Sequence, residues 1–196
     1  CFPIICLISA FTMLIAQGGA PRAAIFMGKG DNKSAERILG NSFSTLIFLS
    51  VILTAVFLIF AEKLLYFFGA SDDTIIYALD YVRIYTAGSV FVMTALGLNL
   101  FISTQGFTVI SMATVLIGAG LNIILDPVFI FVFDMGVKGA AIATVISQAV
   151  SAVWTLAFLT GKKTKLRLTL SSMKIEPSLI LPCLALGLAP FIMQST

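Results

Sequence analysis

The chain has 196 residues, of which 59% are hydrophobic and 11% are charged, and its mean hydropathy is +1.08. A soluble domain has about 25% charged residues, so this composition excludes an ordinary soluble protein and predicts an all-α integral membrane protein. The net charge is +3 and no histidine is present, which excludes histidine-based catalysis and histidine-ligated metals within these residues.

Six apolar segments follow one another along the chain, and a helix needs about 20 such residues to span a bilayer. We expect them at roughly 2–26, 41–61, 81–104, 109–133, 140–159 and from 179 onward. Between the second and third segments, residues 62–73 are expected to form an interfacial connection. The sequence begins and ends inside apolar runs, so we expect it to be part of a longer membrane protein.

The fourth segment carries a carboxylate, Asp126, inside an otherwise apolar run. A charge at the bilayer centre costs roughly 2.5–3.5 kcal/mol even on lenient scales, so such a residue usually faces protein or a water-filled cavity. Small or polar residues recur at every fourth position and share one face of this helix: Thr114, Gly118, Asn122 and Asp126. Pro127 follows directly and predicts a kink beside the acid.

The fifth segment has a similar polar face, formed by Ala140, Thr144 and Gln148. We expect the two faces to meet around a buried cation or proton site, with Thr114 and Gln148 lining a cavity beside it. Asn99 of the third segment is expected to line the same pathway, although a hydrogen bond between helices explains it equally well. A purely structural role for Asp126, as a hydrogen-bonding link between helices, is the competing interpretation.

The basic residues predict how the segments are oriented. Alternate loops lie on the same side of a membrane, and nine of the twelve basic residues then fall on one side. The positive-inside rule places that side in the cytoplasm. We interpret the strongly basic loop at 161–174 as facing the membrane surface, and we expect no nucleic-acid partner.

Three stretches together resemble one known family, the multidrug and toxic compound extrusion (MATE) transporters. The first, at 18–41, contains Gly-Gly-Ala-Pro-Arg, Gly-Lys-Gly-Asp and Ala-Glu-Arg-Ile-Leu-Gly-Asn. The second, at 118–148, contains Asn-Ile-Ile-Leu-Asp-Pro and Gly-Val-Lys-Gly-Ala-Ala-Ile-Ala-Thr. The third is the Lys-rich loop before Gly-Leu-Ala-Pro at 187–190. The resemblance covers essentially the whole chain and is closest to the DinF-type branch.

The resemblance implies a fold of twelve transmembrane helices in two six-helix halves. On that fold, residues 1–177 correspond to helices two to six with the basic loop, and residues 178–196 to the start of helix seven. It also implies a multi-pass protein of the plasma membrane, monomeric when complete, that is no enzyme and needs no cofactor. Such proteins export organic cations and amphipathic compounds in exchange for Na⁺ or H⁺. Three residues here match the branch's first-half cation site, where Na⁺ would bind: Asn122, Asp126 and Thr144.

Three alternatives remain open at the level of sequence. A lipid-linked oligosaccharide flippase has a related architecture, but its cavity should carry several basic residues, and no Lys or Arg lies in the middle of a segment here. A membrane enzyme would need a polar constellation, whereas Asp126 is the single deep acid. A non-transporting scaffold would have no need for an acid beside a proline.

Overall fold

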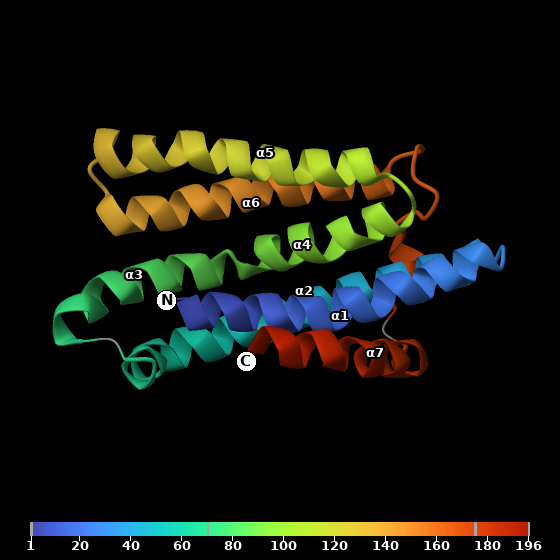
Figure 1. The fold of residues 1–196 in the computed structure, drawn as a ribbon, viewed down its shortest axis with the longest axis horizontal. Helices are drawn as coiled ribbons and strands as arrows, with labels where there is room; N and C mark the ends of the chain where they lie inside the picture. The colour runs from blue at the N-terminus through green and yellow to red at the C-terminus, as the bar shows by residue number, and fades with distance from the viewer. Residues whose placement is uncertain (1, 70, 175, 196) are drawn as a thin grey trace.

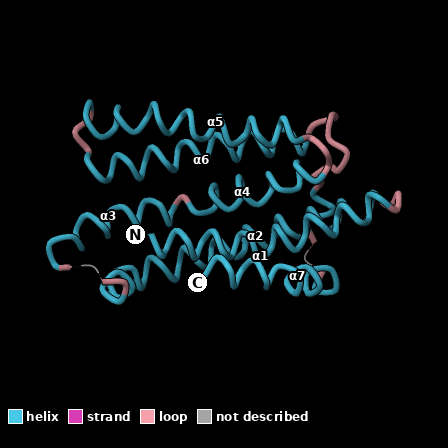
Figure 2. Tube along the Cα trace, in the orientation of Figure 1, coloured by secondary structure: helices cyan, strands magenta, loops and turns pink. Residues whose placement is uncertain are grey.

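Helices joined by loops make up the residues that the computed structural model describes, which are 2–69, 71–174 and 176–195. Figure 1 shows the arrangement, and Figure 2 shows only helices and connecting loops in the described parts. The helices are α1 (Phe2–Gly28), α2 (Asn32–Phe67), α3 (Asp72–Ala87), α4 (Ser89–Thr104), α5 (Thr108–Pro127), the π-helix η1 (Val128–Val132), α6 (Gly136–Thr160), the 3₁₀ helix η2 (Leu170–Met173) and α7 (Pro177–Ser195).

The membrane architecture expected from composition is confirmed. Four described helices are long and apolar enough to cross a bilayer: α1, α2, α5 with η1, and α6. The bent pair α3 and α4 forms a fifth span if it is counted as one, and α7 is a shorter apolar helix.

The helices form three groups across the bundle. In Figure 1, α5 and α6 lie side by side at the top, and α1, α2 and α7 lie together at the bottom. Helices α3 and α4 run end to end between these groups and contact α6 on one side and α2 on the other. Buried apolar clusters fill both ends of the bundle, one around Ile8, Leu53 and Tyr85 and the other around Leu39 and Phe101.

The third span differs from the single helix expected at 81–104. It begins earlier, at Asp72, and is bent by 55° at a break between α3 and α4. Thr54 of α2 holds this break: its Oγ1 donates a hydrogen bond to the Thr86 carbonyl oxygen at 3.0 Å and lies 2.9 Å from the Ser89 Oγ. At Gly88 an added Cβ would lie 2.5 Å from the Val145 side chain, so only glycine lets α6 approach here.

The hydroxyl of Thr54 should therefore contribute to stability more than a threonine that bonds only within its own helix. We expect Thr54→Val to lower the free energy of unfolding by about 1 kcal/mol, because the backbone at the break loses its partner. The measurement is thermal unfolding in detergent. Thr45→Val, on the same helix, is the control, since Thr45 Oγ1 bonds only the Asn41 carbonyl of α2 itself. Equal losses in the two variants would contradict this role.

Two further boundaries differ from expectation. Helix α2 does not end near 61 but continues to Phe67, because Ala61 and Leu65 on its inner face are buried in the core. The expected kink at Pro127 takes the form of a change in helix type: the Phe133 N–H donates to the Val128 carbonyl at 3.0 Å, in the wider π-helical pattern.

Helices α1 and α7 cross at two glycines. A Cβ added at Gly18 would collide with the Cys183 carbonyl, and one added at Gly187 would collide with the Leu14 carbonyl. The two backbones therefore touch directly, as small residues permit in membrane helices. Arg22 also reaches across, and its Nη1 donates to the Leu179 carbonyl oxygen at 3.2 Å.

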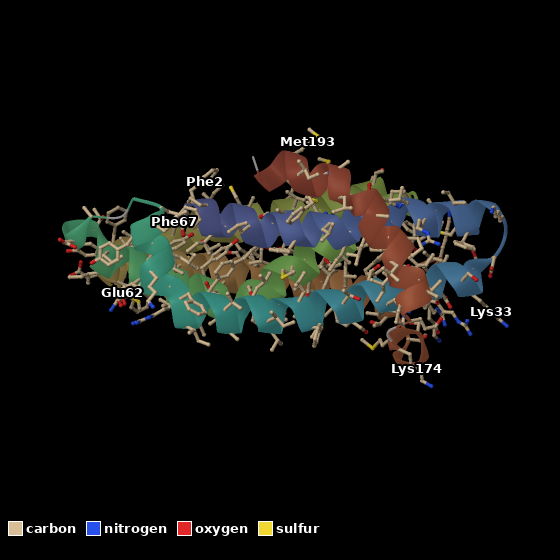
Figure 3. The ribbon with its side chains drawn as sticks, turned by 90° about the horizontal axis from the view of Figure 1, so that it is seen from below. Phe2, Lys33, Glu62, Phe67, Lys174 and Met193 are labelled. Atoms are coloured by element: carbon tan, nitrogen blue, oxygen red, sulfur yellow. The ribbon has the colours of Figure 1, made fainter. Side chains whose placement is uncertain are left out.

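Basic residues from two distant loops lie at the same end of the bundle. Figure 3 shows Lys33 and Lys174 at one end, and Glu62 and Phe67 at the other. Loops that lie far apart in the sequence therefore gather their basic residues at the same end, as the alternation of loops predicted.

Candidate functional site

The polar faces of α5 and α6 meet, as their spacing predicted. The Asn122 Nδ2 donates to the Asp126 Oδ1 at 3.2 Å and lies 3.4 Å from the Thr144 Oγ1, which in turn donates to the Ala140 carbonyl at 2.9 Å. Asn122 and Asp126 lie one turn apart on α5, and the short turn after η1 brings α6 back beside them. One amide group thus connects the acid to the hydroxyl across the helix pair.

All three of these side chains are partly buried. They bring together a carboxylate, a side-chain amide and a hydroxyl, with the Asn122 Nδ2 between the other two. The oxygens of these three kinds of group are ligands that hard cations prefer. A single carboxylate carries one negative charge, which one monovalent cation or one proton neutralises. Within the described ranges, no three acidic, cysteine or histidine side chains gather in the way that a multivalent metal centre requires.

Tyr81 of α3 joins this group, and the sequence analysis missed it. Its hydroxyl lies close to the Thr144 side chain and within electrostatic reach of Asp126. Its ring stacks on Tyr85, with the two centroids 5.9 Å apart. No spacing in the sequence connects Tyr81 to Asp126. The sequence shows only that a tyrosine lies on this helix. Its position near the site follows from the packing of α3 on α6.

A cavity of about 200 Å³ lies beside the site, between α4, α5 and α6. The three residues predicted to line a cavity, Asn99, Thr114 and Gln148, all lie on its wall, and Asn122 and Thr144 lie there too. Ser147 and Ser151 add hydroxyl groups, and the remaining wall is made of alanine, glycine, leucine and valine. Asp126 is not part of this wall, so Asn122 and Thr144 stand between the acid and the cavity.

Asn99 makes a hydrogen bond between helices and also lies on the cavity wall. Its Nδ2 donates to the Ser111 carbonyl of α5 at 3.2 Å, which is the expected bond between helices. Its Oδ1 is buried and has no hydrogen-bond partner among the described residues. A buried acceptor without a partner costs about 1–3 kcal/mol, so this oxygen is available to a water or to an N–H group in the cavity.

Known proteins resemble the chain along almost its whole length. The sequence profile of the MatE family matches residues 1–128. The multidrug export protein MepA of Staphylococcus haemolyticus is 28% identical over 191 residues, which is 97% of this chain and 42% of that protein. The chain therefore spans less than half the length of this relative.

Solved structures agree with the sequence comparison. An inward-facing multidrug resistance MATE transporter of the MOP superfamily superimposes with a TM-score of 0.93 at 27% identity, over 99% of this chain and 44% of that one. An outward-facing structure described in the same terms gives a TM-score of 0.91 at 27% identity, over 98% and 43%. With the membrane-length helices, these relatives identify the chain as a multi-pass protein of the cell membrane.

Proposed function

The chain belongs to the MatE family, and from that premise we propose that the transporter containing it exports cationic or amphipathic small molecules in exchange for Na⁺ or H⁺. The relatives are multidrug export proteins rather than enzymes. We further propose that the complete protein acts as a monomer and needs no cofactor other than the coupling ion.

The observation that carries the proposal is the bridge that Asn122 makes between Asp126 and Thr144. A cation bound by the oxygens of these residues, or a proton on Asp126, removes the charge between α5 and α6. Pro127 and η1 follow at once, where the helix has already left the α-helical pattern. Neutralising Asp126 would therefore change the charge next to a part of the helix that can repack. The change favours either the inward-facing or the outward-facing state, provided that the ion binds these two states with different affinity.

The two superpositions support movement of this unit as one body. The chain matches an inward-facing and an outward-facing transporter almost equally well, with TM-scores of 0.93 and 0.91. A unit that keeps its fold in both states is what rocking of one half against the other requires.

The cavity suits a substrate with an apolar body and a hydrogen-bond donor. Its wall is mostly apolar, and the free Asn99 Oδ1 and the Gln148 amide offer polar contacts. No Lys or Arg occurs among the residues lining it. The flippase alternative, which needs basic residues for a pyrophosphate, therefore finds no support.

The test is efflux of a cationic dye by the complete transporter in efflux-deficient cells, under imposed Na⁺ and pH gradients. We expect efflux to follow one of the two gradients and to stop when an ionophore collapses that gradient. A transporter that moves no cationic dye under either gradient would contradict the proposal. Efflux that ignores both gradients would contradict the coupling.

A further inference from the structure

The basic loop at 161–174 is fixed to the bundle by a buried glutamine. Gln105, in the turn between α4 and α5, is only 1% exposed. Its Oε1 accepts three hydrogen bonds from the loop: from the Thr164 Oγ1 at 2.7 Å, the Lys165 N–H at 3.0 Å and the Leu166 N–H at 2.9 Å. One side chain of the helical bundle thereby holds three consecutive residues of the loop.

The rest of the loop is anchored mainly to α2. The Arg167 N–H donates to the Glu36 Oε1 at 2.9 Å, and the Leu168 N–H donates to the Leu159 carbonyl at 3.0 Å. Farther along, the Ser44 Oγ donates to the Met173 carbonyl at 2.7 Å. The backbone is therefore held at both ends of the loop and in its middle.

This anchoring sorts the side chains of the loop into two sets. Thr164, Leu166 and Leu168 are buried against the bundle, whereas Lys165 and Arg167 between them are exposed. The alternation is that of an extended segment with one face on the protein. The cations are consequently exposed on a backbone that is already ordered.

Neighbouring cations extend the charge, and none of them forms a salt bridge among the described residues, although Asp31 lies within electrostatic reach of Arg37. We define the basic surface as six exposed residues: Arg37, Lys162, Lys163, Lys165, Arg167 and Lys174. The only salt bridge among the described residues joins Lys138 to Asp80, outside this surface. Glu36, the nearest acid by its contacts, already accepts the Arg167 backbone N–H.

The basic surface lies at one end of the helical bundle. It lies where α6 ends and α2 begins, at the end of the bundle where Figure 3 shows Lys33 and Lys174. The Lys165 Nζ lies over the Phe107 ring, 5.9 Å from its centroid. Aromatic rings and long basic side chains together are typical of membrane interfaces.

We propose that the basic surface binds the phosphate groups of anionic phospholipids in the adjacent leaflet, and that Gln105 organises it for this purpose. Each Lys or Arg near an anionic membrane surface strengthens association about fivefold. A loop that is already ordered loses less entropy on binding than a flexible one. This surface is separate from the ion and substrate sites, so the proposal does not depend on the transport function.

The test uses the complete transporter in nanodiscs of phosphatidylcholine that contain a small amount of spin-labelled lipid. The measurement is the fraction of spin label immobilised on the protein, for phosphatidylglycerol and for phosphatidylcholine. We expect Lys165→Gln with Arg167→Gln to reduce the preference for phosphatidylglycerol by about 25-fold, which is about fivefold for each cation removed. The matched control is Lys63→Gln with Arg83→Gln, which removes two exposed cations outside the basic surface and should leave the preference unchanged.

Two further measurements test the role of Gln105 and whether free phosphate competes with the lipid. Gln105→Leu keeps every charge but removes the anchor, so we expect a weaker preference for phosphatidylglycerol and faster tryptic cleavage within 162–167. An excess of inorganic phosphate should not displace the lipid. An unchanged preference in the Lys165 and Arg167 variant, an equal loss in the control, or displacement by phosphate would overturn the proposal. An unchanged preference in folded Gln105→Leu would overturn the organising role of Gln105.

Discussion

Replacing Asp126 by asparagine is expected to abolish the dependence of efflux on the coupling gradient while leaving the transporter folded. Asparagine has nearly the same shape as aspartate, and its Oδ1 can still accept the hydrogen bond that Asn122 donates. It cannot carry the charge that a cation or proton would neutralise. Coupling free energies between sites are typically about 1–3 kcal/mol, so gradient-driven efflux should fall by roughly 5- to 150-fold.

Dye efflux under imposed Na⁺ and pH gradients, at equal amounts of protein in the membrane, measures this loss. Asp134→Asn is the matched control, because Asp134 is exposed in the turn before α6 and its φ of +52° is one that asparagine adopts as readily as aspartate. We expect this control to behave as wild type. Full gradient dependence in Asp126→Asn, or the same loss in Asp134→Asn, would leave Asp126 with a structural role only.

Replacing Gly187 by alanine is expected to force α7 away from α1. The added Cβ would collide with the carbonyl of Leu14, a backbone group that cannot rotate aside. Overpacking of this kind costs about 1–3 kcal/mol or more, and here it acts on a crossing that Arg22 and Leu179 also help to hold. The expected result is a clear fall in the midpoint of thermal unfolding in detergent.

Gly120→Ala is the matched control for that experiment. Gly120 lies inside α5 with nothing near the position that a Cβ would take, so the change should be neutral or should stabilise the helix by up to about 1 kcal/mol. Gly18→Ala repeats the test on α1, where the Cβ would meet the Cys183 carbonyl. If Gly187→Ala unfolds at the same temperature as Gly120→Ala, the two helices are not held by backbone contact.

Much of the fold could be predicted from the sequence because it depends on apolar length alone. The bend between α3 and α4 could not. No proline lies there, and the break depends on the Thr54 hydroxyl and on the Val145 side chain, which the chain brings close only after folding. The extension of α2 to Phe67 was also not predicted. The charged Glu62 and Lys63 interrupt the apolar pattern, although Leu65, which follows them, is buried in the core.

The central part of the candidate site was accessible because it obeys local rules. A four-residue spacing places Asn122 above Asp126, and a short turn returns Thr144 to the same level. Tyr81 reaches the site only through the packing of α3 on α6, which no pattern within α3 specifies. The binding roles of these residues stay predictions until the efflux experiments are done.

The contacts that follow the anchored loop indicate how far along the chain the residues are held to the preceding helices. The boundary that we predict at 177/178 would separate the two repeats in sequence. The Glu176 N–H, however, donates to the Asn41 Oδ1 of α2 at 2.6 Å, and the Arg22 Nη1 donates to the carbonyl of Leu179 in the first turn of α7. The start of α7 is thus clamped to the preceding helices. A pivot between the two halves would therefore lie farther along the chain, and α7 contains two natural weak points at Pro182 and Pro190. When the preceding helices move, the start of α7 would move with them.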